Sequence, residues 1–195
     1  MSLLGLFSGN PRDMLAGYAT AAPSSPTQFF RSNQPRIGLY DSASDTGQVA
    51  LATGVMTSVP VFLAAGDVIT SISARSGATA AGTPTNYWFA LYSDAATPAL
   101  LSQSADQTST AWAANTTKTL ALAAAQTIAR TGVYWVGIMV TATTPPTLLG
   151  SAAVAPIVTG ERNLSQSSGS SLTATAPATI ATPTVKQFSP YVVLT

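Results

Sequence analysis

The stretch Tyr87-Trp-Phe-Ala-Leu-Tyr92 is apolar or aromatic throughout, and it decides the fold class. A strand with one covered face alternates apolar and polar residues, whereas a strand covered on both faces is apolar throughout. The run therefore predicts a strand in the middle of a sandwich. Residues 93–98 have turn chemistry, and residues 99–103 are expected to return as the partner strand of a hairpin.

Further short strands are expected on both sides of this hairpin. Residues 68–75 (Val-Ile-Thr-Ser-Ile-Ser-Ala-Arg) largely alternate with period two, which is typical of a half-buried strand. Strands are also predicted at residues 37–40, 55–59, 61–63, 118–122, 133–140 and 188–195, with weaker signals at 147–149, 157–158 and 172–174. The alanine-rich residues 111–114 and 123–125 are the best helical alternatives. Roughly eight or nine strands without a long helix predict an all-β, antiparallel β-sandwich of jelly-roll or Greek-key type over residues 35–195.

Residues 1–34 differ from this pattern and are predicted to form an extended N-terminal arm. Glycines and prolines interrupt short apolar pieces, so no segment is long enough to bury a face by itself. A loose terminus is one interpretation. The other, favoured here, is an arm that lies on a neighbouring molecule, because disordered tails are usually poor in large apolar residues. Its expected anchors are Leu3, Leu4, Leu6, Phe7, Met14, Leu15, Phe29 and Phe30.

The residue types needed for most catalysis are scarce. The chain has no His, no Cys and one Glu, and only 8% of its residues are charged, against about 25% in ordinary domains. Enzymes draw acids, bases, nucleophiles and metal ligands mostly from these types. We therefore expect a protein that is not an enzyme, with no catalytic, cofactor-binding or metal-binding residues.

Three kinds of site could still contradict this expectation: a pair of carboxylates, a calcium-binding loop and a Ser–Lys pair. Asp41 with Asp45, and Asp94 with Asp106, are the candidate carboxylate pairs, but each lies among turn residues where Asp commonly caps the backbone. Residues 41–47 could offer oxygen ligands to calcium but lack the terminal Glu of an EF-hand loop. A Ser–Lys pair would need Lys118 or Lys186 desolvated beside a hydroxyl.

Charge and hydropathy narrow the expected partners and location. A net charge of +1 gives no basic face for nucleic acid. No apolar run reaches the roughly 18 residues that a bilayer span requires. The start of the chain lacks a basic region before its broken apolar stretch, so no signal peptide is expected.

Six of the aromatic residues have two possible roles. Tyr87, Trp88, Tyr92, Trp112, Tyr134 and Trp135 are expected to pack in the core or at an interface. The alternative is an outward set that stacks on sugars and makes the chain a carbohydrate-binding or receptor-binding module.

Residues 87–149 resemble a segment found in structural proteins of tailed bacteriophages, especially phages of actinobacteria. The similarity covers about a third of the chain. It runs through LYS (91–93), SADQ (104–107), AWAANT (111–116), KTLAL (118–122), VGIMV (136–140) and PTL (146–148). It implies a jelly-roll protein of the capsid-decoration, head-fibre or minor tail type.

The resemblance and the composition together predict a non-enzymatic phage virion structural protein. The expected role is a capsid decoration protein that binds the major capsid protein and copies of itself as a homotrimer, with no cofactor. It would be made in the host cytoplasm and end on the capsid surface. Two alternatives stay open at this stage: a carbohydrate-binding or receptor-binding module of a tail or head fibre, which could contact host surface glycans, and a glycosidase or esterase whose carboxylates converge in a cleft.

Overall fold

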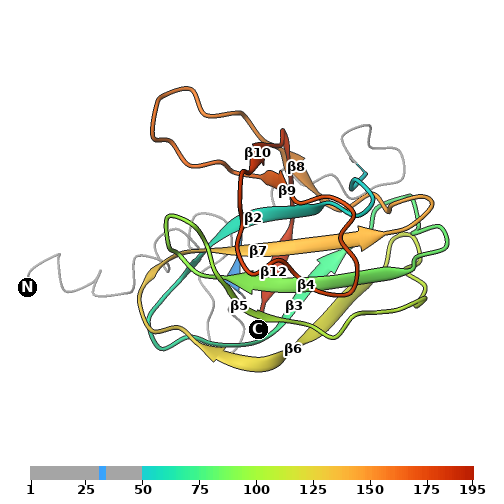
Figure 1. Cartoon of the computed structure of the whole chain (residues 1–195), viewed down its shortest axis with the longest axis horizontal. Helices are drawn as coiled ribbons and strands as arrows, with labels where there is room; N and C mark the ends of the chain where they lie inside the picture. Colours follow the sequence, from blue (N-terminus) through green and yellow to red (C-terminus); the bar gives the residue numbers. More distant parts are fainter. Residues whose placement is uncertain (1–30, 34–49) are drawn as a thin grey trace, which may run out of the picture.

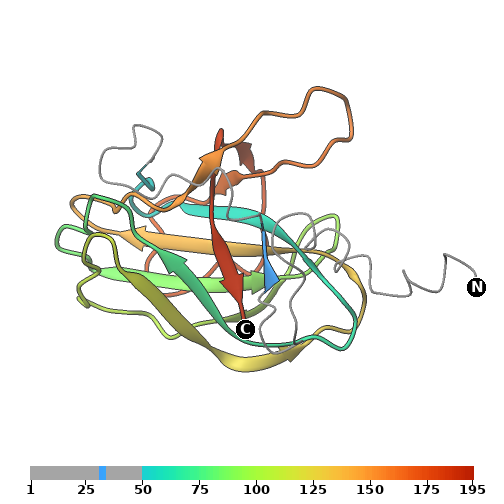
Figure 2. The same ribbon diagram turned by 180° about the vertical axis from the view of Figure 1, so that it is seen from behind.

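The computed structural model describes residues 31–33 and 50–195, and in these residues the chain is all-β without a helix. Antiparallel sheets pack face to face (Figures 1 and 2), which confirms the predicted β-sandwich. The strands are β1 (Arg31–Ser32), β2 (Met56–Leu63), β3 (Val68–Arg75), β4 (Asn86–Tyr92), β5 (Leu100–Gln103), β6 (Thr117–Thr127), β7 (Gly132–Thr141), β8 (Gly150–Ala152), β9 (Gln166–Ser168), β10 (Thr184–Val185), β11 (Phe188–Pro190) and β12 (Val192–Leu194).

The chain alternates between two sheets. One has the strand order β1-β12-β3-β6, the other has β10-β9-β2-β7-β4-β5, and β11 pairs with β8 in a separate ribbon. The connections β2–β3, β3–β4, β5–β6 and β6–β7 each cross from one sheet to the other, as in Greek-key sandwiches. At one side the sheets are joined, because Leu122 of β6 pairs with Ser104, just after β5.

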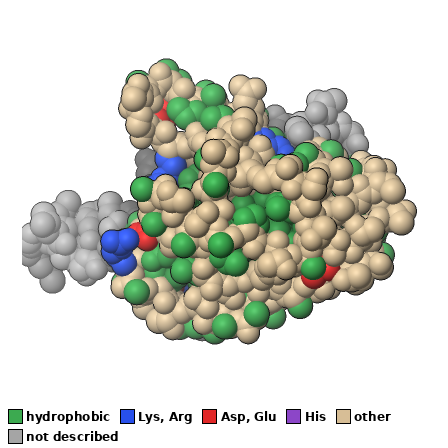
Figure 3. Space-filling view, in the orientation of Figure 1, with side chains coloured by type: hydrophobic (Ala, Val, Ile, Leu, Met, Phe, Trp, Pro, Cys, Tyr) green, Lys and Arg blue, Asp and Glu red, His purple; other side chains and the backbone are tan. Residues whose placement is uncertain are grey.

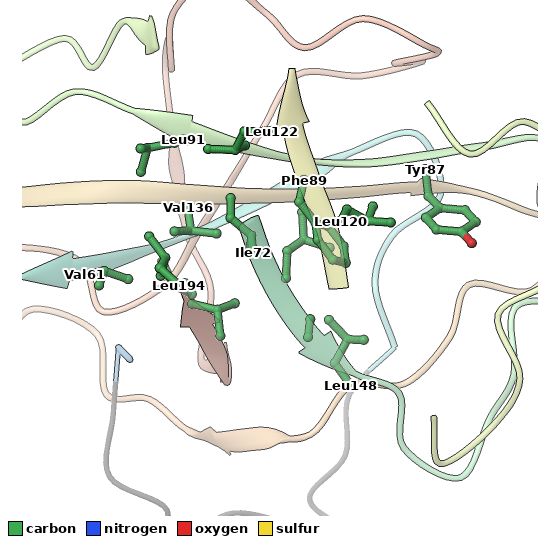
Figure 4. Packing of buried hydrophobic residues seen from close by; sticks show 14 of the residues in the cluster. Val61, Ile72, Tyr87, Phe89, Leu91, Leu120, Leu122, Val136, Leu148 and Leu194 are labelled. Atoms are coloured by element: carbon green, nitrogen blue, oxygen red, sulfur yellow. The ribbon is translucent and has the colours of Figure 1, made fainter. Parts of the chain in front are cut away.

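Alternate residues of β4 form the centre of the core between the sheets. Tyr87, Phe89 and Leu91 are fully buried on the face toward the four-stranded sheet. Figure 4 shows these three side chains in one cluster with Ile72 of β3 and Leu120 of β6, and Phe89 lies beside both. The Trp112 ring packs on Tyr87 and Phe89, with ring centroids 5.5 and 5.8 Å away.

The opposite face of β4 is buried as well, under a segment without regular secondary structure. Trp88, Ala90 and Tyr92 are fully buried in a second apolar cluster. Their cover is the loop of residues 169–183, which crosses the outer face of β7 and β4 (Figure 1). The cluster also includes Met56, Trp135, Met139, Ala176 and Ile180. The sandwich therefore has a third layer on this side, and the continuous apolar run of β4 reflects cover on both faces.

Side chains of the sheet hold this covering loop by hydrogen bonds to its backbone. Trp88 Nε1 donates to the Thr173 carbonyl at 2.7 Å, and the Tyr92 hydroxyl donates to the Pro177 carbonyl at 3.0 Å. Gln103 donates to the Ala174 carbonyl at 3.0 Å and accepts from the Ala176 N–H at 2.6 Å. Burial raises the pKa of Tyr92, so its hydroxyl keeps its proton and remains a donor.

Most central strands lie where the pattern predicts them, but several details differ. The strands predicted at residues 55–59 and 61–63 form one strand, β2, which begins at Met56 and continues through Pro60. β9 pairs with β2 only as far as Ser58. At Pro60 that side of β2 is therefore a local sheet edge, where the missing N–H of proline is tolerated. Residues 123–125 lie in β6, and 111–114 are irregular around Trp112, so neither is helical. Residues 157–158 and 172–174 are loop, and the strand predicted at 147–149 reduces to isolated bridges before β8.

The N-terminal arm, its eight expected anchors and the strand predicted at residues 37–40 lie outside the described residues. The end of the arm, residues 31–33, is bonded to the sheet. β1 pairs with β12, Arg31 forms an ion pair with Asp67 at 3.0 Å, and Asn33 bonds the Pro190 carbonyl and the Val192 N–H. Whatever precedes residue 31 therefore leaves the sandwich from a fixed point beside the last strand.

We expect Gln103→Ala to destabilise the fold through the covering loop. The change removes two hydrogen bonds to the loop and leaves the Ala176 N–H without its partner, a loss of about 1–2 kcal/mol in the free energy of unfolding. Urea unfolding measures it. Gln107→Ala is the matched control, because the Gln107 amide bonds only the nearby Ala105 carbonyl, and it should change stability by less than about 0.5 kcal/mol. Equal effects of the two changes would contradict the role of Gln103.

Candidate functional site

The most exposed apolar side chains of the described residues lie on one projecting loop. This loop, residues 153–165, joins β8 to β9 and extends away from the sandwich (Figure 1). It carries Val154, Ile157, Val158 and Leu164, and Ile157 is 83% exposed. Figure 3 shows hydrophobic side chains gathered on the projection. Burying such residues is the main way in which protein surfaces gain association energy, so the projecting loop is a candidate contact site.

Glu161 gives the tip of the projecting loop a defined shape. Its carboxylate accepts hydrogen bonds from the backbone N–H of Ile157 at 2.7 Å and of Val158 at 3.5 Å. The Glu161 N–H in turn donates to the Val158 carbonyl. The single Glu of the chain therefore closes a turn that presents two apolar side chains, and this pre-organisation reduces the entropy lost on binding.

A second candidate contact surface is the outer face of the four-stranded sheet. Here hydroxyls pair across strands: Ser73 with Thr119 at 2.7 Å, and Ser71 with Thr195 at 2.6 Å. Beside them, β6 exposes Ala121, Ala123 and Ala125. The hydroxyls bond one another and the alanines carry no polar side-chain atom, so Arg75 at the end of β3 supplies the charge on this side of the strand.

A hollow of about 520 Å³ lies between the projecting loop, the β4–β5 turn and the end of the covering loop. Its polar and charged lining comes from Asp94, Thr97, Arg162, Gln166 and Thr182, with Trp135 and Ile180 among its apolar residues. The Arg162 guanidinium lies over the Trp135 ring, 5.7 Å from its centre. Asp94 bonds Arg130 at 3.0 Å, and this partner raises the pKa of Arg130.

The six aromatic residues weighed as a sugar-stacking platform are all buried. Trp135 and Tyr134 are 5% exposed, and Tyr87, Trp88, Tyr92 and Trp112 are fully buried. The expected role in packing is confirmed for these rings, and none of them offers an open face for stacking.

The carboxylate pairs do not form a site in the described residues. Asp106 bonds Asn86, at the start of β4, whereas Asp94 follows the end of the same strand, so they are roughly 20 Å apart at about 3.3 Å per residue. Asp41 and Asp45 lie outside the described residues. No group of three or more potential metal-ligating side chains occurs within residues 31–33 and 50–195.

Lys186 comes closest to the Ser–Lys arrangement, with a threonine as its partner. Its ammonium donates to Thr57 Oγ1 at 3.2 Å, and burial lowers the pKa of Lys186. Thr57 is 1% exposed near the start of β2, so a substrate cannot reach its hydroxyl. The contact is therefore structural.

The contact residues of the projecting loop were missed by the sequence interpretation, which treated residues 151–183 as a loop with brief strands. The available signal was large apolar residues without strand or helix period, next to Pro156 and Gly160. The hollow had no sequence signal, because its walls come from segments far apart in the chain.

Comparison with protein families finds no family model that matches the chain, and comparison with curated proteins finds no match. The part of the chain that the structure describes holds no helix with the length and hydropathy of a membrane span.

We expect Lys186→Met to raise stability at neutral pH, and the gain to shrink at high pH. With its pKa lowered on folding from the usual 10.5, the folded state loses the Lys186 proton before the unfolded state does. The free energy of unfolding of the wild type therefore rises with pH from the lowered pKa up to about 10.5. The variant lacks this contribution from Lys186. Urea unfolding of both chains between pH 7 and 10.5 measures the difference. A difference that is independent of pH would contradict the assignment.

Proposed function

We propose that this chain is a non-enzymatic virion structural protein of a bacteriophage, a capsid decoration protein that binds the major capsid protein and copies of itself. The observation that carries the proposal is the projecting loop, where four large apolar side chains are exposed and a turn closed by Glu161 presents two of them, Ile157 and Val158. A protein that functions through contact area needs such a pre-formed apolar projection. The sequence resemblance to phage structural proteins supports the virion as its setting.

The projecting loop offers a useful free energy of contact. Fully burying a Val, Leu or Ile side chain contributes about 1.5–3 kcal/mol. With 53–83% of each of the four side chains exposed, docking the loop would contribute on the order of 4–8 kcal/mol before association costs. A single copy would bind weakly with this area. Repeated contacts over a shell, together with the outer β3–β6 face against a sister copy, would make binding strong through avidity.

The attachment of residues 31–33 supports a role for the preceding arm. Their bonds to Asp67, Pro190 and Val192 hold the start of the sandwich to its last strand. Binding by the preceding residues would therefore act on a segment that is itself bonded to the sandwich. The eight apolar residues Leu3, Leu4, Leu6, Phe7, Met14, Leu15, Phe29 and Phe30 are its proposed anchors on the capsid, and a homotrimer is the proposed assembly.

Replacing the four apolar side chains of the projecting loop by Ser should reduce capsid binding at least tenfold without unfolding the protein. The matched control is Leu101→Thr with Val185→Thr, two exposed apolar residues outside the loop and outside the β3–β6 face, which should bind as the wild type does. Co-sedimentation with particles of the parent phage that lack this protein measures occupancy, and thermal unfolding verifies the fold. Wild-type occupancy of the Ser variant would remove the projecting loop from the proposal. Failure of the wild-type chain to bind any phage particle would remove the virion function itself.

Deleting residues 1–30 should abolish incorporation into particles, because the eight proposed anchors are lost together. The described β1 strand and its bonds are kept in this variant, so circular dichroism should show the same β-rich fold. Electron cryo-microscopy of particles assembled with the shortened chain gives the occupancy. Full occupancy would show that the arm is dispensable for attachment.

A further inference from the structure

We propose that the hollow beside the projecting loop binds a saccharide unit that carries a carboxylate, such as a uronic acid. This binding function goes beyond the proposed structural role and stands independently of it. The hollow lies where the β4–β5 turn, the start of β7 and residues 160–166 meet. Its charge, its free hydrogen-bond donors and its shape all favour such a ligand.

Among the described residues, no carboxylate pairs with Arg162. Arg31 and Arg130, in contrast, each pair with an aspartate at 3.0 Å. Arg162 instead lies exposed over the Trp135 ring. This contact holds the guanidinium beside the hollow, and a guanidinium with free N–H groups can bind a carboxylate through two parallel hydrogen bonds.

Gln166 supplies a second donor at a fixed orientation. The residue is 3% exposed, yet it lines the hollow. Its Oε1 accepts from Asn163 Nδ2 at 2.9 Å, so the amide is oriented with Nε2 as its donor end. Nε2 has no protein acceptor in the described residues, and it is not enclosed away from solvent. Gln166 is therefore a buried lining residue with a donor that a ligand oxygen in the hollow could satisfy.

The lining of the hollow holds one charge of each sign, Asp94 and Arg162, and the Glu161 carboxylate next to Arg162 is bonded to the backbone N–H groups of Ile157 and Val158. Asp94 Oδ1 accepts from Arg130 Nη2. Asp94 is therefore balanced by Arg130, and the charge of Arg162 is left for a ligand. An anionic ligand is favoured over a neutral or cationic one.

The size and lining indicate a ring rather than a single carboxylate. A volume of about 520 Å³ lies within the usual range of small-molecule sites, and a carboxylate alone would fill only the part beside Arg162. The remaining lining mixes hydroxyls with small apolar groups: Thr97 and Thr182 beside Ala95, Ala96, Pro98, Ile180, Ala181 and Pro183. A sugar ring has the matching surface, with hydroxyls at its rim and C–H groups on its faces.

Titration of the full chain with digalacturonate, followed by calorimetry and by the NMR signals of the tryptophan indoles, tests the site. We expect saturable binding at millimolar or lower concentration, weakened at least tenfold by Arg162→Gln and by 0.5 M salt. The matched control is Lys118→Gln, which removes another cation near an aromatic ring, 5.9 Å from the centre of Tyr87, and should leave binding unchanged. Neutral maltose should bind at least tenfold more weakly.

Three outcomes would overturn the inference. The first is that digalacturonate does not bind even at concentrations 20-fold above the roughly millimolar dissociation constant expected for a small open site. The second is equal binding by the wild type and Arg162→Gln. The third is tighter binding of a Glu-containing tripeptide than of digalacturonate, which would assign the hollow to a peptide partner. None of these results bears on capsid occupancy, so this inference and the virion function can fail separately.

Discussion

The structure depends on the need to cover both faces of the β4–β7 pair. Tyr87, Phe89 and Leu91 are covered by the opposite sheet, and Trp88 and Tyr92 are covered by residues 169–183. A loop over an apolar surface brings backbone polar groups with it, and these must find partners. The indole N–H of Trp88, the hydroxyl of Tyr92 and the amide of Gln103 provide them. The aromatic residues therefore fill space and hold the cover in one place.

The burial of these aromatic residues determines which side chains remain on the surface of the molecule. The largest side chains are used in the two apolar clusters, and the surface is left mainly with alanine, serine and threonine; the face in Figure 3 carries few charged groups. The clearest exception is the projecting loop, where Ile157 and Val158 remain outside. Beside it, Arg162 lies over Trp135, with no acidic partner among the described residues. An apolar projection and a hollow lined by Arg162 thus lie at the same end of the sandwich, which places the proposed adhesive and saccharide-binding roles next to each other.

The central strands could be predicted from the sequence because their pattern is local. Alternation at residues 68–75 gives β3, and the unbroken apolar run at 87–92 gives β4, each within one residue of its bounds. The course of residues 151–183 could not be predicted, because it is fixed by partners in β4 and β5 about 70 residues or more away. The continuity of β2 through Pro60 depends on where β9 stops pairing, which is also a tertiary feature. The hollow combines Asp94, Trp135 and Arg162 and has no local pattern at all.

Native-state hydrogen exchange of the covering loop tests the central claim most directly. The N–H groups of Leu172, Ala176 and Ile180 donate to Gly54, Gln103 and Pro98, respectively. If the loop is a third layer of the sandwich, these three amides should exchange at least a hundredfold more slowly than in an unfolded chain, corresponding to opening free energies above about 2.7 kcal/mol. Exchange at the unfolded-chain rate, with β4 and β7 still protected, would show that the outer face of the aromatic strand is not covered in solution and would contradict the account.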